Sequence, residues 1–164
     1  MPSSESAAVI VNALKEAGVG LVASLPDFSL VELVAALDED NELNHVALSR
    51  EEEGVGICTG ACFSGAHCAL VMQNGGMLNS CNAPATTALQ FNIPMLLLVL
   101  YSGGDGEPAF PVLGQVTEPV LDALGISTHS LERIKDASDV IGGALMQAYK
   151  MKKPVAVLLP KRVL

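Results

Sequence analysis

Six short runs of aliphatic residues alternate with stretches of helical periodicity along this chain, and this alternation constrains the fold more than any other feature. Short, continuous apolar runs between helices are typical of strands that are buried on both faces. Strands that are separated by helices pair in parallel, with helices covering both faces of the sheet. The sequence therefore predicts an α/β fold with a six-stranded parallel sheet.

The predicted elements follow one another without a linker, an internal repeat or a low-complexity segment, so we expect residues 1–164 to form one domain. Residues 102–114, rich in Gly and Pro, are predicted to form a loop. The predicted helices lie at about residues 7–17, 30–37, 51–63, 77–91, 117–124 and 137–150. The predicted strands lie at about residues 19–25, 43–48, 67–72, 95–100, 126–129 and 155–159.

Polar residues stand where the predicted strands end. Ligands of open parallel sheets bind beyond the carboxyl ends of the strands, so residues at these ends are candidates for a site. The residues that fall there are Asp27, Arg50, Glu51, Gln73, Asn74 and Ser102.

The chain is acidic, with 18 Asp and Glu against 9 Lys and Arg and a formal net charge of −9. Nucleic acid and anionic membrane surfaces would repel such a body, so we expect neither as a partner. From Glu51 to Glu132 there is no Lys or Arg, which leaves half of the chain without a cation for a phosphate group. A phosphorylated ligand therefore needs cations from elsewhere.

The four cysteines stand among small or apolar residues and lack the paired Cys-x-x-Cys spacing of zinc sites, so we expect free thiols and no metal site. The sequence starts without the basic and apolar regions of a signal peptide. The most apolar run, residues 95–101, is too short to span a bilayer. We therefore expect a cytoplasmic protein.

Glu51 opens the predicted helix 51–63 and is followed by small and apolar residues. The unpaired N–H groups and the dipole of a helix start favour a carboxylate, so a charged cap is one interpretation. A functional carboxylate is the other. The next predicted strand runs directly into the polar turn Gln73-Asn74-Gly75-Gly76, and two such turns in succession indicate a site.

Several motifs occur together in this chain: Leu25-Pro26-Asp27, Glu51 nine residues before Gly60, Gln73-Asn74-Gly75-Gly76-Met77-Leu78-Asn79, Ile93-Pro94, and Leu113-Gly114 leading into residues 117–126. In this combination the chain resembles the pyrimidine-binding domain of thiamine diphosphate enzymes, which has a flavodoxin-like fold. The resemblance is closest to the alpha subunits of sulfopyruvate decarboxylases and the matching half of phosphonopyruvate decarboxylases. It covers nearly the whole chain.

The resemblance implies that Glu51 hydrogen-bonds a ring nitrogen of the cofactor's aminopyrimidine, which favours the imino tautomer that deprotonates the thiazolium carbon. It also implies that Gln73, Gly75, Gly76 and Asn79 pack beside the aminopyrimidine, where glycine permits a close approach of the backbone. A plain strand-to-helix turn requires glycine as well, so that interpretation stays open.

Asp27, Arg50 and Ser102 are candidates for substrate contacts. Related decarboxylases place an acid at the turn that Asp27 occupies, which implies proton transfer to or from the reacting carbon; an ordinary helix cap is the alternative. The resembling decarboxylases carry Arg where this chain has Ser102, and a hydroxyl cannot replace the bidentate contact of a guanidinium with a sulfonate or phosphonate. The identity of the 2-oxo acid is therefore left open.

In the resembling enzymes a second domain holds the diphosphate and Mg²⁺, through a Gly-Asp-Gly motif followed by an Asn ligand. Residues 104–107 spell Gly-Asp-Gly-Glu, but no Asn occurs at residues 130–137, so we interpret this segment as a substrate-side loop and assign no metal ligand to this chain. The resemblance implies a beta subunit that carries the diphosphate and Mg²⁺ site, in a hetero-oligomer with at least two copies of each chain.

These features together predict the alpha subunit of a two-chain thiamine diphosphate-dependent decarboxylase, a lyase, that acts on a small 2-oxo acid such as sulfopyruvate or phosphonopyruvate. Two alternatives stay open. One is a carboligase or acyltransferase subunit with the same cofactor, and the other is a flavodoxin-like binding module without catalysis.

Overall fold

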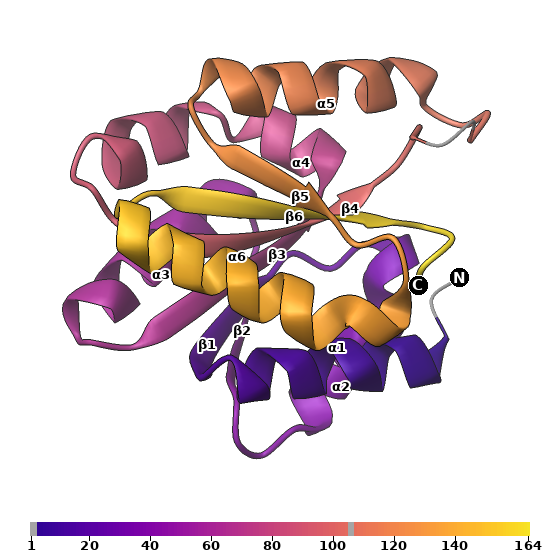
Figure 1. Ribbon diagram of the computed structural model, residues 1–164, viewed down its shortest axis with the longest axis horizontal. Helices are drawn as coiled ribbons and strands as arrows, with labels where there is room; N and C mark the ends of the chain where they lie inside the picture. Colours follow the sequence, from indigo (N-terminus) through magenta and orange to yellow (C-terminus); the bar gives the residue numbers. More distant parts are fainter. Residues whose placement is uncertain (1–2, 105–106) are drawn as a thin grey trace.

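The computed structural model describes residues 3–104 and 107–164, which form one sheet between two layers of helices (Figure 1). The strands are β1 (Val19–Ser24), β2 (Asn44–Ala47), β3 (His67–Gln73), β4 (Met95–Tyr101), β5 (Ser127–Ser130) and β6 (Pro154–Pro160). The α-helices are α1 (Ser4–Glu16), α2 (Val31–Glu39), α3 (Glu51–Phe63), α4 (Asn74–Asn79), α5 (Pro111–Ala123) and α6 (Ala137–Met151). Shorter helical segments are η1 (Phe28–Leu30), η2 (Pro84–Leu89) and η3 (Ile134–Asp136).

The strand order is β2-β1-β3-β4-β6-β5, and each neighbouring pair is parallel. The predicted six-stranded parallel sheet is therefore confirmed. The chain runs from β1 outward to β2 and then returns past β1 to β3, so the direction of winding reverses between β1 and β3. In open α/β sheets this reversal is where ligands bind, beyond the carboxyl ends of the strands.

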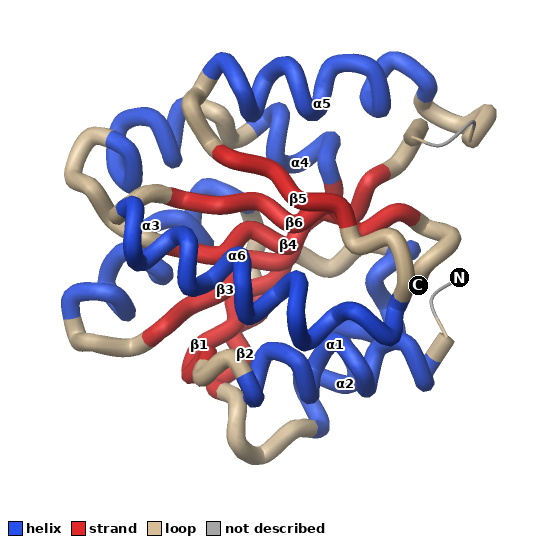
Figure 2. Tube along the Cα trace, in the orientation of Figure 1, coloured by secondary structure: helices blue, strands red, loops and turns tan. Residues whose placement is uncertain are grey.

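The sheet divides the core into two apolar layers. Helices α1, α2 and α6 lie on one face of the sheet, and α3, α4, α5 and η2 lie on the other (Figure 2). Their buried side chains form a separate apolar cluster on each face. Successive side chains of a strand point to opposite faces, so in β4 Leu96 and Leu98 join the first layer and Leu97 and Val99 join the second. Burial on both faces explains why the strands are continuous aliphatic runs.

One predicted helix is interrupted in the structure. The segment expected as a single helix at residues 77–91 starts earlier, as α4, leaves the helical path at Ser80 and resumes as the π-helical η2. Ser80 Oγ donates to the Met77 carbonyl at 3.1 Å, and Pro84, which has no N–H, is the first residue of η2. The prediction of one continuous helix is wrong because these residues end one helix and begin another.

Helix α5 begins earlier than the sequence predicted. Its expected range was 117–124, but it starts at Pro111, so the predicted loop at 102–114 is shorter. Proline at the first position of a helix loses no hydrogen bond, which makes it a good start. Gly114 packs against Gly103 so closely that a Cβ atom on either would overlap the backbone of the facing segment. Pro111 and Gly114 therefore belong to α5, where the proline starts the helix and the glycine permits close packing against Gly103.

Helix α1 begins at a serine cap and is followed by a glycine. Ser3 is the N-cap of α1, and its side chain accepts a hydrogen bond from the Ser6 N–H at 3.0 Å. The helix ends at Glu16, and Gly18 follows with a φ of +79°, a left-handed conformation that favours glycine. The chain then enters β1, which lies at the reversal point of the sheet.

All four phenylalanines of the chain lie at the surface. Phe28 and Phe63 are each 76% exposed, Phe91 is 66% exposed and Phe110 is 62% exposed. Phe28 follows β1 and Phe110 precedes α5, so two of them flank the carboxyl edge of the sheet. Within the described part of the chain, none of the helices has the length and apolar character needed to cross a membrane.

Candidate active site

Glu51 is the first residue of α3 and is only 8% exposed. Helix α3 follows β2, and Glu51 lies against Gly76 of α4, which follows β3. A Cβ atom on Gly76 would overlap the Glu51 carboxylate, so glycine is what allows the two helix starts to meet. Among the described residues, none donates a hydrogen bond to this carboxylate. Its oxygens therefore remain available to a ligand at the reversal point of the sheet.

The two glutamates after Glu51 have other partners. Glu53 Oε2 accepts from the backbone N–H groups of Ser49 and Arg50 at 3.0 and 3.2 Å, which caps the start of α3. Glu52 forms an ion pair with Arg50 at 3.1 Å, and the hydrogen bonds from that guanidinium lower the pKa of Glu52. Of the three consecutive glutamates, only Glu51 is buried in the site.

Arg50, a predicted substrate residue, therefore points its guanidinium at Glu52. The Arg50 side chain is 66% exposed, and the hydrogen bonds to Glu52 raise its pKa. Exposed ion pairs of this kind contribute little to stability and break readily. The cation is at the expected edge of the sheet, but its guanidinium is exposed and hydrogen-bonded to Glu52.

The turn after β3 brings together most of the residues predicted to pack beside the aminopyrimidine. The Gln73 side chain lies beside Gly75, with its Oε1 3.5 Å from the position a Gly75 Cβ would take. Gly76 contacts Glu51 as described. Asn79 is exposed at the opposite end of α4. The structure thus gathers Glu51, Gln73, Gly75 and Gly76, and leaves Asn79 about one turn of helix away.

Asn74 holds this turn in place through a buried network. Its Nδ2 donates to the Ser102 carbonyl and to Thr117 Oγ1, both at 2.9 Å, and its Oδ1 accepts from the Ser102 N–H at 3.3 Å. Asn74 and Thr117 are fully buried and Ser102 is 4% exposed. These bonds join the ends of β3 and β4 to α5. Ser102, a predicted substrate residue, is anchored by its backbone in this network.

Asp27 lies in the turn between β1 and η1. Its Oδ1 accepts a hydrogen bond from the Ser29 N–H at 2.8 Å, which is the cap interaction that the sequence offered as an alternative. The side chain is partly exposed. One carboxylate oxygen is thus used as a cap, and the second has no hydrogen-bond partner among the described residues, so a cap and a substrate contact are compatible in one residue.

Hydrogen bonds from Tyr101 and to Glu107 hold the segment that follows β4. The Tyr101 hydroxyl donates to the Gly114 carbonyl at 2.9 Å, and Glu107 Oε2 accepts from the Gly103 N–H at 2.9 Å. The other Glu107 oxygen pairs with Lys161 Nζ at 2.6 Å. Asp105 and Gly106, the centre of the Gly-Asp-Gly-Glu segment interpreted as a substrate-side loop, lie outside the described residues.

Hydrogen bonds connect Ser24 of β1 to His45 of β2, and His45 to Asp38 of α2. Ser24 Oγ is 2.8 Å from His45 Nε2, and His45 Nδ1 is 2.6 Å from Asp38 Oδ1. The order of side chains is that of a hydrolase triad, but Ser24 is fully buried, so no substrate reaches its hydroxyl. The series ties α2 to β1 and β2 and has a structural role.

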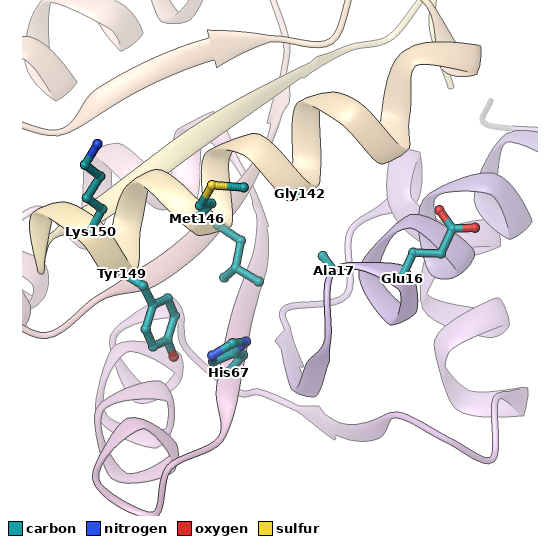
Figure 3. Close-up of a pocket in the computed structure, with 8 residues that line it drawn as sticks. Glu16, Ala17, His67, Gly142, Met146, Tyr149 and Lys150 are labelled. Carbon is teal, nitrogen blue, oxygen red and sulfur yellow. The ribbon is translucent and has the colours of Figure 1, made fainter.

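A separate hollow of about 580 Å³ lies at the opposite edge of the sheet. His67, the first residue of β3, and Tyr149 of α6 face each other in it, with ring centroids 4.2 Å apart (Figure 3). Lys150 and Glu16 also border the hollow but extend away from the two rings (Figure 3). The seven residues of β3, about 20 Å of extended chain, separate it from the Glu51 site.

Fold and site define the class of this protein. Residues 5–140 match the family described as thiamine pyrophosphate enzyme, N-terminal TPP binding domain, and the chain belongs to this family. The chain is 36% identical to the sulfopyruvate decarboxylase subunit alpha of Methanocaldococcus jannaschii over 151 residues, 91% of this chain and 89% of that one. It is 34% identical to the subunit of the same name from Methanococcus maripaludis, covering 92% and 91% of the two chains.

The chain is also 26% identical over 162 residues to the phosphonopyruvate decarboxylase of Streptomyces viridochromogenes. That alignment takes in 96% of this chain but 41% of the relative, so this chain corresponds to less than half of a longer protein. The resemblance inferred from the motifs is thereby confirmed, and so is the fold class.

The site fits one part of thiamine diphosphate. A nearly buried carboxylate with available oxygens, beside a glycine turn, suits the polar edge of an aminopyrimidine. Residues 51–132, which form the turns around Glu51, hold no Lys or Arg to pair with the doubly charged end of the cofactor. In the described residues no group of three or more His, Cys, Asp or Glu side chains is arranged to hold a metal ion. The residues around Glu51 therefore fit the pyrimidine half of the cofactor.

Proposed function

We propose that this chain is the alpha subunit of a two-chain thiamine diphosphate-dependent decarboxylase that acts on a small 2-oxo acid. The observation that carries the proposal is the Glu51 carboxylate, nearly buried, without a donor among the described residues, and seated against Gly76. The names of the sulfopyruvate decarboxylase alpha subunits support the subunit assignment. On this proposal residues 1–164 form a single pyrimidine-binding domain.

Bound thiamine diphosphate supplies the carbanion that adds to the 2-oxo group and accepts the electrons released with CO₂. Glu51 binds the aminopyrimidine and holds a proton at its ring nitrogen. Gln73, Gly75 and Gly76 orient the same ring by packing beside it, and Asn79 contributes only if the ring extends toward the end of α4. The helix start around Glu51, covered by the turn after β3, keeps water away from the carboxylate.

The substrate lies, on this proposal, at the carboxyl ends of β1, β2 and β4. Asp27 moves a proton to or from the reacting carbon with the carboxylate oxygen that Ser29 leaves free. Ser102 forms part of the floor beside it. Arg50 reaches the substrate when its exposed pair with Glu52 opens, which costs little.

The diphosphate and Mg²⁺ are held, we propose, by a beta subunit that docks on the carboxyl edge of the sheet. The lack of cations in residues 51–132 supports this division, because an anionic diphosphate needs positive groups that this half of the chain does not offer. The assembly would contain at least two copies of each chain. A cytoplasmic location remains a prediction from the sequence.

The test is turnover by this chain assembled with its beta subunit, for the wild type and the Glu51→Gln variant. Glu51→Gln should assemble normally and lose at least about 100-fold in kcat, the size of a typical acid–base contribution. Glu39→Gln is the matched control, since it removes an exposed carboxylate at the end of α2, away from the proposed site. Substantial activity of Glu51→Gln would overturn the proposal. Product analysis with an added aldehyde separates decarboxylation from carboligation.

A further inference from the structure

We propose that Lys161 is a specificity residue that binds the second acidic group of the 2-oxo acid, at the end opposite the carboxylate that leaves as CO₂. This inference rests on the proposed function and deepens it. A substrate such as a sulfonated or phosphonated 2-oxo acid carries two anionic ends, and an acidic protein needs a cation near the reacting centre to hold the end that stays.

Few cations are placed at the carboxyl edge of the sheet within the described residues. Arg50 follows β2, and its exposed guanidinium lies on Glu52. Lys161 and Arg162 follow β6. Arg162 pairs with Glu132 in the loop after β5, and Arg133 of the same loop pairs with Asp136. Lys161 reaches the other way, toward the segment after β4, where it meets Glu107 at 2.6 Å. Lys161 is thus the cation directed toward the middle of the edge.

Contacts connect Lys161 to the Glu51 site without a break. Glu107, its partner, accepts a hydrogen bond from the Gly103 N–H at 2.9 Å. The residue before it, Ser102, is bound on both backbone polar groups by Asn74.

Asn74 begins the turn in which Gly76 meets the Glu51 carboxylate. A ligand that reaches from Glu51 along the end of β4 therefore moves toward Lys161. These contacts are all fixed by hydrogen bonds or close packing, so they place the ammonium group at a defined position relative to the site.

The ammonium group of Lys161 can serve a ligand while it remains paired. It has three N–H donors, and the contact with Glu107 uses one of them. The Lys161 side chain is 34% exposed, so the other donors are accessible. The second oxygen of Glu107 accepts from the Gly103 N–H, so Glu107 links Lys161 to the segment after β4.

The test compares two kinds of substrate in the assembled enzyme. One kind carries a terminal sulfonate or phosphonate on the 2-oxo acid, and the other, pyruvate, carries no second acidic group. Lys161→Met should lower kcat/KM for the doubly acidic substrates by about 10-fold to 100-fold, chiefly through KM, and leave pyruvate turnover unchanged. Lys161→Arg should restore part of the preference, because the cation is kept.

Two control variants separate a substrate contact from a structural role. Arg162→Met removes the neighbouring cation, which pairs with Glu132 instead, and should leave the substrate preference unchanged. Glu107→Gln weakens the pin on the loop but keeps the Lys161 charge, so it should retain the preference for doubly acidic substrates. If Glu107→Gln loses the preference as Lys161→Met does, the pair of Glu107 and Lys161 only stabilises the segment after β4, and the proposal is wrong.

Binding gives a readout that does not depend on turnover. Calorimetric titration of 3-sulfopropanoate, an unreactive acid with both anionic groups, into the assembled enzyme should show binding that Lys161→Met weakens by about 10-fold or more. Equal loss of pyruvate and sulfonate turnover in Lys161→Met, or no loss at all, would overturn the inference while the decarboxylase assignment stands. A wild-type assembly that decarboxylates no 2-oxo acid would instead overturn the proposed function, and this inference with it.

Discussion

The carboxylate of Glu51 touches Gly76, a residue 25 positions further along the chain, at a distance that leaves no room for a side chain. This contact joins the starts of α3 and α4 where the sheet reverses its direction of winding. It explains why an acidic residue and a glycine occur at these two places. The geometry is sensitive to a single methyl group.

Gly76→Ala tests this contact directly. The new Cβ would overlap the Glu51 carboxylate, so the two helix starts must separate, and we expect a loss of about 1–3 kcal/mol in the free energy of unfolding. The measurement is urea denaturation of the chain alone. Gly75→Ala is the matched control, because the nearest atoms to its Cβ, 3.5 Å away, are in ordinary contact. Equal stability of the two variants would show that the contact is loose.

Asn74→Ala should be strongly destabilising. The substitution removes three buried hydrogen bonds: two to the backbone N–H and carbonyl of Ser102, and one to the Thr117 hydroxyl. Buried polar groups that lose a partner cost about 1–3 kcal/mol, which we expect to see in denaturant unfolding. Asn12→Ala, at an exposed position of α1, should change stability by less than about 0.5 kcal/mol. A similar, small effect for both would mean that the network contributes little.

The pair of Glu107 and Lys161 predicts a pH dependence of stability. The hydrogen bond from Lys161 lowers the pKa of Glu107, against the opposing effect of burial. A carboxyl group with a lowered folded pKa contributes stability that is complete above its unfolded pKa and is lost as pH falls through the folded pKa. The stability difference between wild type and Glu107→Gln should therefore be constant near neutral pH and shrink below about pH 4. Urea unfolding from pH 3 to 7 measures it, and a difference that does not vary with pH would contradict the pairing.

The thiols should react slowly while the chain is folded. A hydrogen bond with Cys68 and burial raise the pKa of Cys58, and burial raises the pKa of Cys62 and Cys81. Because the thiolate is the reactive form, a raised pKa lowers the rate of alkylation at a given pH. We expect iodoacetamide at pH 8 to label Cys58 at least about 10-fold more slowly in the folded chain than in urea, as measured by mass spectrometry. Equal rates would show that the helix α3 opens readily.

Much of the fold is visible in the sequence because the sheet is buried on both faces. Runs such as Met95–Tyr101 and Pro154–Pro160 are aliphatic at nearly each position, and such runs identify central parallel strands. The start of α5 was missed although Pro111 is a standard helix start, because Gly and Pro were interpreted as loop residues. The break at Ser80 was missed because apolar spacing continues across it.

The candidate site was only partly predictable, since its strongest contacts join residues far apart in the chain. Asn74 bonds residues 28 and 43 positions away, and Glu107 pairs with a residue 54 positions away. No local pattern reveals such partners. The pairing of Arg50 with Glu52 is different, because a cation two residues from a carboxylate could have been recognised as a competitor for the substrate.

The exposed phenylalanines should affect how fast unassembled copies of the chain are degraded in the cell. A copy that has not yet met its partner displays four aromatic rings to water, and cellular chaperones and proteases act on proteins that display apolar groups. We expect surplus copies to be removed faster than assembled ones. Degradation would then match the amount of this chain to the amount of its partner without any dedicated regulator.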